Sequence, residues 1–332
     1  VTFVDTTEYL PEERWDVSQA QDGSVMAGVS EEGDLYCLFI AADGGVAAPE
    51  DCSGLFQGYE NVEAIYFTGA FHTENTTSMS SMFSGCAKLE VLDLEGIDTS
   101  NVTDMSSMFS SCDIVELDAG DWDTSRVEDM GNMFYFCEEL AELDLSGWDT
   151  SAVTDMGSMF FYCESLTELD LSGWDTASVT DMSNMFQNCK GLERLNCSGW
   201  DISSVSDMRS VFRNCGKLTQ LSADGWEIPG SADTEDMFSG CGVSSLGGGT
   251  GSSGGGTAPS IGAVTIAAAI SQPENSGATV QSLDVYLGLE PTVTYKDKSA
   301  QVVERVEQDM LEGYFDMLAQ CGFVAYEEWH TN

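Results

Sequence analysis

The stretch Leu143-Asp144-Leu145-Ser146-Gly147-Trp148-Asp149-Thr150 returns 26 residues later as Leu169-Asp170-Leu171-Ser172-Gly173-Trp174-Asp175-Thr176. The segment that follows each copy also repeats, because Val153-Thr154-Asp155-Met156 corresponds to Val179-Thr180-Asp181-Met182. Seven cysteines mark the spacing, with steps of 26, 25, 26, 26, 26 and 26 residues: Cys86, Cys112, Cys137, Cys163, Cys189, Cys215 and Cys241. A fixed period of this size predicts stacked coils, in which each unit buries its apolar face against its neighbours.

Each coil contains the same three parts. Leu92 and Leu94 alternate around Asp93, which predicts a short strand with one buried face. A polar turn follows, and then Met105, Met108 and Phe109 fall at the i, i+3, i+4 spacing of a helical face. The sequence therefore predicts a leucine-rich-repeat-like repeat solenoid of parallel strands plus short helical turns, with a period of 26 residues.

The composition changes along the chain and predicts four segments. Residues 1–50 do not repeat and are expected to form an N-terminal β cap, with strands at 1–4 and 35–40. The solenoid occupies 51–246, and the Gly/Ser-rich run at 247–257 has the composition of a flexible linker. Residues 258–332 predict a small α+β module, with strands at 261–270 and 279–289, an amphipathic helix at 299–320 that Gly322 ends, and a strand from Phe323.

The chain is strongly acidic, with 11 Lys and Arg against 57 Asp and Glu and a formal net charge of −46. Binding to phosphates requires Lys and Arg to displace counterions, so this balance argues against nucleic acid and against anionic membrane surfaces. No apolar run reaches the roughly 20 residues of a membrane helix, so membrane insertion is not expected. A protein partner is expected to present a basic surface.

The repeated cysteines predict a column of small buried thiols rather than disulfides. Stacked neighbours have parallel Cβ directions, and their Cβ atoms stay about 4.8 Å apart, further than the roughly 3.8 Å that a disulfide prefers. Cys37 and Cys52 lie outside the repeat, and a disulfide between them is an open alternative.

Aspartates form columns at fixed places in the coil. Two of these columns are candidate Ca²⁺ ligands, consisting of Asp98, Asp123, Asp149, Asp175 and Asp201 in one and of Asp104, Asp129, Asp155, Asp181 and Asp207 in the other. Calcium requires six to eight oxygens, and the chain has no loop of the Asp-x-Asp-x-Asp-Gly type to supply them. The favoured interpretation is structural, with each carboxylate accepting a hydrogen bond from a backbone amide of its own turn. No other cofactor is expected.

A tryptophan column occupies the polar turn. It consists of Trp122, Trp148, Trp174, Trp200 and Trp226. Packing is the favoured interpretation, because Ile97 takes the same place in an earlier coil. The alternative is that the indole rings bind sugar rings or a partner's aromatic residues.

Catalysis is not expected, since the two histidines are far apart in sequence, at His72 and His330. The serines show no nucleophile-elbow pattern, and the glycine run lacks the lysine of a phosphate-binding loop. Carboxylate pairs recur in every coil, whereas catalysis needs one site with distinctive pKa values.

The repeated Leu-Asp-Leu-Ser-Gly-Trp-Asp-Thr-Ser and Val-Thr-Asp-Met-Ser-x-Met-Phe-x-x-Cys segments resemble the BspA-like leucine-rich-repeat surface proteins of bacteria, over about residues 50–245. The resemblance implies display on the bacterial cell surface, outside the cell, and a non-enzymatic function in adhesion or recognition. The implied partner is a protein or glycan of a host or neighbouring cell. The residues after Gly256 lie outside the resemblance.

A second function remains open from the residues themselves. The apolar segment Val1 to Val4 and the segment 261–270 could each add as a strand to a neighbour's sheet. Such self-association would make the chain a structural subunit of a cell-surface filament or layer.

Overall fold

The computed structural model describes residues 1–8, 10–11, 14–32, 35–246 and 320–325. Their contacts divide the chain into two compact units. The first unit contains the described residues up to Val102 together with 320–325, and the second contains residues 103–246. The predicted linker, the predicted strands at 261–270 and 279–289, and the predicted helix to residue 319 lie outside the described residues.

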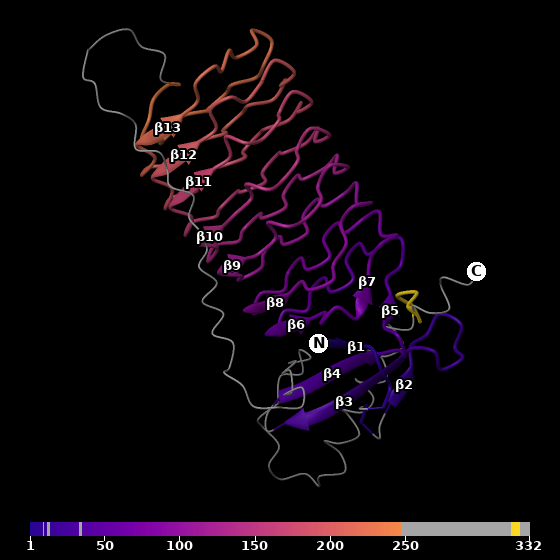
Figure 1. Ribbon diagram of the computed structural model, residues 1–332. Coiled ribbons are helices and arrows are strands. Elements are labelled where there is room, and N and C mark those ends of the chain that lie inside the picture. The colour runs from indigo at the N-terminus through magenta and orange to yellow at the C-terminus, as the bar shows by residue number, and fades with distance from the viewer. Residues whose placement is uncertain (9, 12–13, 33–34, 247–319, 326–332) are drawn as a thin grey trace, which may run out of the picture. The chain divides into compact units, whose positions relative to one another are not determined.

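The first unit contains two sheets. A mixed six-stranded sheet has the order β2-β3-β4-β1-β6-β8 (Figure 1). Its strands are β1 (Thr2–Val4), β2 (Arg14–Asp16), β3 (Met26–Glu32), β4 (Leu35–Ala41), β6 (Ala64–Tyr66) and β8 (Val91–Asp93). A three-stranded sheet has the order β14-β5-β7, with β5 (Val46–Ala47), β7 (Phe71–His72) and β14 (Val324–Ala325). The strands expected at 1–4 and 35–40 are thereby confirmed.

Strand β1 lies inside its sheet. It pairs in parallel with β4 on one side and with β6 on the other, through Thr2↔Phe39 and Thr2↔Tyr66. Val1 and Phe3 have no exposed surface. Both edges of Val1 to Val4 are already paired within this fold. The expectation that this segment is available to add to a neighbour's sheet is therefore wrong. The sequence pattern indicated an apolar strand but not its place in the sheet.

The described end of the predicted C-terminal module belongs to the first unit. Strand β14 pairs antiparallel with β5 through Val324↔Ala47 and Ala325↔Val46. Phe323 is fully buried and contacts the rings of Phe3 and Phe71. The predicted return strand is confirmed at residues 324 and 325, and it completes a sheet of the N-terminal cap.

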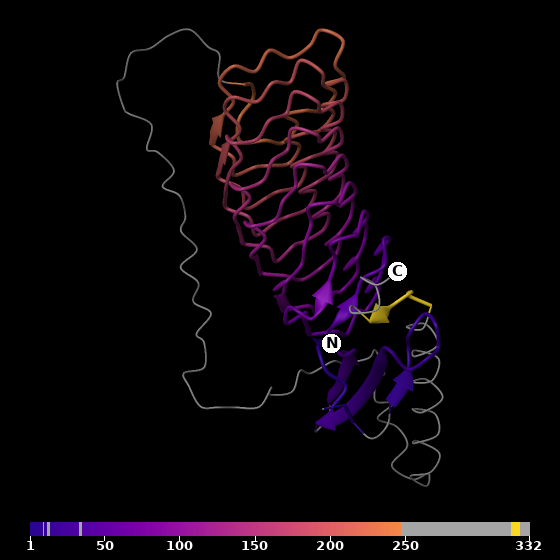
Figure 2. The same ribbon diagram turned by 45° about the vertical axis from the view of Figure 1, so that its right-hand side comes forward.

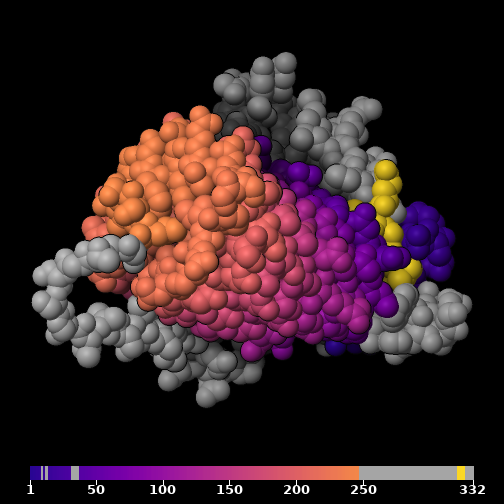
Figure 3. Space-filling view, turned by 90° about the horizontal axis from the view of Figure 1, so that it is seen from above, coloured from indigo at the N-terminus to yellow at the C-terminus, as the bar shows by residue number. Residues whose placement is uncertain are grey.

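The second unit is a solenoid of parallel coils, and Figure 2 shows these coils as stacked layers. Its strands are β9 (Glu116–Leu117), β10 (Glu142–Leu143), β11 (Glu168–Asp170), β12 (Arg194–Asn196) and β13 (Gln220–Ser222). β9 pairs with β10, and β12 lies between β11 and β13, all in parallel. The last coils, orange in Figure 3, form the face nearest the viewer in that view. The predicted repeat solenoid is confirmed.

The helical turns predicted within each coil are wrong, and no helix occurs among the described residues. The segment after Asp104 instead makes two tight turns. Ser107 and Ser111 have positive φ angles of 57° and 60°, which end any helical run. Every second backbone N–H from Met105 to Ser111 donates to a carbonyl of the next coil, at 2.7–3.0 Å. The backbone donors that a helix would use within one coil thus join neighbouring coils.

Identical apolar side chains stack in the core of the second unit. The phenylalanine rings stack with centroids 5.4–5.8 Å apart and interplanar angles of 5–24°. This column consists of Phe109, Phe134, Phe160, Phe186, Phe212 and Phe238. Methionine, valine and cysteine columns beside it are almost fully buried, except for Cys241 in the last coil, which is half-buried. The residues that suggested a helical face are therefore core residues, as expected, although their backbone is not helical.

Candidate functional site

The aspartate columns close turns, as the structural interpretation expected. Asp104 Oδ1 accepts the backbone N–H of Ser106 at 2.9 Å, and Asp123 Oδ1 accepts that of Ser125 at 3.0 Å. The same contact, between an aspartate and the residue two positions later, recurs at Asp98, Asp129, Asp149, Asp155, Asp175, Asp181, Asp201 and Asp207. Each of the ten candidate Ca²⁺ ligands thus uses one oxygen on its own backbone.

The column from Asp104 to Asp233 is the most crowded of these, because its members also form parallel bridges from coil to coil. Burial raises the pKa of Asp129, and the neighbouring carboxylates of Asp155 and Asp104 raise it further. Among the described residues, no three His, Cys, Asp or Glu side chains gather as a metal site. The two candidate columns therefore provide no cluster of ligands for Ca²⁺ among the described residues.

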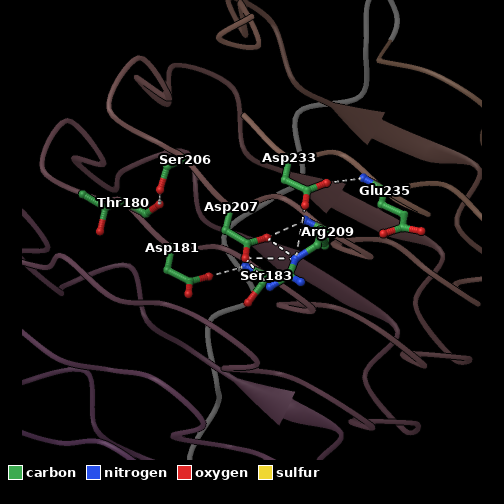
Figure 4. Close-up of polar contacts among 8 residues, drawn as sticks. All are labelled: Thr180, Asp181, Ser183, Ser206, Asp207, Arg209, Asp233 and Glu235. Carbon is green, nitrogen blue, oxygen red and sulfur yellow. Dashed lines mark hydrogen bonds and ion pairs between the residues drawn. The ribbon is translucent and has the colours of Figure 1, made fainter. Parts of the chain in front are cut away.

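Arg209 relieves this repulsion at one end of the column (Figure 4). Its guanidinium donates to both carboxylate oxygens of Asp207 at 2.5–3.0 Å, and its Nε lies 3.7 Å from Asp233 Oδ2. These hydrogen bonds lower the pKa of Asp207. Gly157 occupies the equivalent position between Asp155 and Asp181. There an added Cβ would lie 3.1 Å from Asp155 Oδ1 and 3.4 Å from Asp181 Oδ1.

We expect Gly157→Arg to raise the free energy of unfolding by about 1 kcal/mol. About half of the gain would come from the reduced freedom of the unfolded chain, and the rest from ion pairs with Asp155 and Asp181. Urea denaturation at low and high salt measures both parts, because only the ion pairs are screened. Gly157→Ser is the matched control, since Ser183 holds this position in the next coil. A gain equal to that of the serine variant at every salt concentration would contradict the ion-pair argument.

The tryptophan column is a packing feature. Trp122, Trp148, Trp174 and Trp200 are 2–7% exposed, and only Trp226 at the end is half-buried. Neighbouring rings stack at 5.6–6.5 Å, and the Nε1–H of Trp148 donates to the carbonyl of Ala119 at 2.9 Å. Since their faces cover one another, these rings are not the partner-binding platform that the sequence left open.

The cysteine column consists of thiols rather than disulfides, as predicted. Cys163 Sγ donates to the carbonyl of Phe134 at 3.1 Å, and Cys137, Cys189 and Cys215 make the same contact one coil back. Burial raises the pKa of Cys137 to about 12, which keeps the thiol protonated and unreactive. Cys37 and Cys52 are buried thiols that form no disulfide, so the alternative of a disulfide between them is wrong.

An aromatic patch is the feature that departs most from the repeat. It consists of Tyr135, Phe136, Phe161 and Tyr162, all of them half-buried. Tyr135 stacks on Phe161 with centroids 4.8 Å apart, and Phe136 stacks on Tyr162 at 4.5 Å, each with an interplanar angle of 6°. The neighbouring coils carry Ser110-Ser111 and Gln187-Asn188 at these positions. Two coils thus present large rings where the repeat otherwise places small or polar side chains.

The backbone beneath this patch is strained. Phe136 and Tyr162 have φ angles of 59° and 63°, and they are the only aromatic residues with positive φ among those described. Other coils place Gly, Ser or Asn there, which adopt this conformation more readily than bulky residues do. Such strain costs on the order of 1 kcal/mol per residue and persists where the surroundings enforce it. Strained positions of this kind cluster at functional sites, so Phe136 and Tyr162 mark a candidate site.

The patch has a carboxylate rim. Asp113, Glu138 and Glu164 each follow the cysteine of their coil, and Glu139 follows Glu138. Asp113, Glu138 and Glu139 are exposed, and Glu164 is half-buried. In the next coil Lys190 takes this position, and its Nζ lies 2.5 Å from Glu164 Oε1 and 5.4 Å from the centroid of the Tyr162 ring. Aromatic faces and carboxylates together are a combination that attracts cations.

The sequence-based reasoning missed this patch because it followed what the coils share. The signal was present one residue before each cysteine, where Gly, Ser, Phe, Tyr, Asn, Asn and Gly succeed one another. A phenylalanine and a tyrosine in a series of residues that favour turns mark a local departure from the repeat.

Comparison with known proteins agrees with the repeat analysis. A family model described as "Mycoplasma protein of unknown function, DUF285" matches residues 50–142 and 136–245. No curated protein and no solved structure matches the chain. Among the described residues, no helix has the length and apolar character needed to cross a membrane. Because the matched residues make up more than half of the sequence and coincide with the repeats, the chain belongs to the DUF285 family.

Proposed function

We propose that this protein is a non-enzymatic recognition module displayed outside the cell on a bacterial surface, and that it adheres through the aromatic patch. The carrying observation is the pair of aromatic residues that two coils hold at strained positions on the surface. Solenoids bind partners through surfaces built from several coils. The resemblance of residues 50–245 to BspA-like surface proteins supports the proposed location and the choice of adhesion.

The chemistry of the patch supports recognition over a purely structural function. Tyrosine and phenylalanine at a surface supply large, stiff contact areas, and such residues are enriched where partners bind. Apolar surface that is scattered singly needs no explanation, but four contacting rings form a contiguous patch. The alternative, a filament subunit joined by strand addition, has less support from Val1 to Val4, since that strand is internal. Its other segment, 261–270, lies outside the described residues.

The test replaces the patch with residues from the next coil. In the variant Tyr135→Gln, Phe136→Asn, Phe161→Gln, Tyr162→Asn, both altered coils carry the Gln-Asn pair of residues 187 and 188. We expect saturable binding of the tagged full chain to a panel of epithelial and bacterial cells, measured by flow cytometry. The variant should weaken it by tenfold or more, which corresponds to about 1.4 kcal/mol.

Folding controls accompany this experiment. Asparagine relieves the strain at 136 and 162, which offsets part of the lost stacking, so we expect the variant to remain folded by circular dichroism. Val115→Thr removes another exposed apolar side chain, which is 52% exposed, and should leave binding unchanged. Equal binding by the patch variant and the unmodified chain would contradict the proposal, as would the absence of saturable binding to every cell type.

A further inference from the structure

We propose that the aromatic patch and its carboxylate rim bind a basic segment of a protein, whose Arg and Lys side chains lie over the rings and pair with Glu138, Glu139 and Glu164. This inference rests on the proposed function and adds the chemical class of the partner.

Lys190 shows how this surface holds a cation. Its ammonium group donates to Glu164 at 2.5 Å while lying 5.4 Å from the centroid of the Tyr162 ring. The hydrogen bond to Glu164 raises the pKa of Lys190, and the nearby Tyr162 and Glu138 raise it further. One lysine of this chain thus already lies over one ring of the patch and next to a rim carboxylate.

One coil earlier, the position that corresponds to Lys190 carries a carboxylate instead of a cation. Phe136 lies one coil before Tyr162, and the residue that corresponds there to Lys190 is Glu164. Glu138 and Glu139 form no ion pair within the described part of the chain. By the 26-residue correspondence, Glu164 holds beside Phe136 the position that Lys190 holds beside Tyr162, so a carboxylate stands where the next coil has a cation. A cation gains from an aromatic face and also from a charge-assisted hydrogen bond to a carboxylate, so a surface that offers both can bind it through two contacts.

The charge of the chain favours a basic protein segment over the other partners that could bind an aromatic surface. A second copy of this chain would bring a further formal charge of −46 to an acidic rim. Nucleic acids and sulfated glycans would be repelled in the same way. Neutral sugars stack on exposed rings and can donate hydroxyl hydrogen bonds to the carboxylates, but they bring no charge to pair with them. A neutral glycan would therefore need the rings but not the charge of the rim, since glutamine side chains also accept hydrogen bonds.

The experiment measures binding of the full chain to immobilised short peptides that alternate Arg or Lys with Ser, by surface plasmon resonance at about 0.15 M salt. A peptide that alternates Asp with Ser is the negative control. We expect the patch variant Y135Q/F136N/F161Q/Y162N to weaken binding by about tenfold, although it keeps every charge, because each lost cation–π contact is worth about 0.5–1 kcal/mol. We expect a similar loss for the rim variant E138Q/E139Q/E164Q.

The matched control is E116Q/E142Q/E227Q, which removes the same charge from exposed carboxylates elsewhere in the second unit and should change the dissociation constant by less than about twofold. Equal losses in the rim variant and this control, with none in the patch variant, would show attraction to net charge alone and overturn the inference. Cell binding that needs the rings but not the rim, and that a neutral glycan competes away, would overturn the inference and leave the proposed function standing. If the patch variant bound cells as well as the unmodified chain does, both the inference and the proposed function would be wrong.

Discussion

Phe160→Ala is expected to lower the free energy of unfolding of the second unit by about 3–5 kcal/mol, as large aromatic-to-alanine changes in cores do. Phe160 has no exposed surface, and its ring stacks between those of Phe134 and Phe186, at 5.6 and 5.5 Å. Alanine would leave a cavity that neighbouring coils cannot fill without breaking the backbone hydrogen bonds between them. In a solenoid the loss falls on both interfaces of the altered coil.

The adjacent residue offers a matched control. Phe161 follows Phe160 in the chain but is half-buried in the aromatic patch, and Gln187 takes its place in the next coil. We expect Phe161→Gln to change stability by no more than about 1 kcal/mol. Urea denaturation followed by tryptophan fluorescence reports mainly on the second unit, because five of the seven tryptophans lie there. Equal destabilisation by the two variants would contradict the division between core column and surface patch.

The period predicted the stacked columns because burial repeats with the sequence. Every regular coil places its Met, Phe and Cys at the same positions, and these are buried in the second unit except at its end, where Phe238 and Cys241 are half-buried. The backbone conformation of each coil was harder to predict from the sequence, because the spacing of Met105, Met108 and Phe109 matches a helical face although the segment is not helical. The left-handed residues Ser107 and Ser111 decide otherwise. Serine is also common at helix ends, so these two residues did not contradict the predicted helical turn. The backbone hydrogen bonds alternate between partners in the same coil and partners in the next coil, and the sequence of a single coil does not reveal this alternation.

The aspartate and tryptophan columns differed in how well the sequence predicted their role. Aspartate in a turn has a local partner, so the capping of Ser106 by Asp104 followed from short-range chemistry. The exposure of a tryptophan depends on the coils on either side of it, and the sequence left Trp148 open between packing and recognition. Its 3% exposure resolves that choice. The patch at Phe136 was missed because averaging over repeats hides the coils that differ.

The second large effect is expected at Phe323, in the first unit. Its ring meets Phe3 and Phe71 edge to face, with centroids 6.2 and 6.3 Å apart. Its carbonyl accepts the backbone N–H of Gln19 at 2.8 Å. Residues near the two ends of the sequence thus share one apolar cluster, which neither the repeat nor local propensity could reveal. We expect Phe323→Ala to lower the stability of the first unit by about 3–5 kcal/mol.

Hydrogen exchange of the full chain provides the measurement, because it resolves the loss by segment. The backbone amides of β1 and β5 should lose protection in Phe323→Ala, since β14 pairs with β5 and the ring of Phe3 comes from β1. Val324→Ala is the matched control, because Val324 lies in the same strand but is only half-buried, and its truncation should cost roughly 1 kcal/mol. If the two variants exchanged alike, β14 would be a surface strand held by its backbone alone. A selective loss for Phe323→Ala would show that the cap needs this ring from the far end of the sequence to close its core.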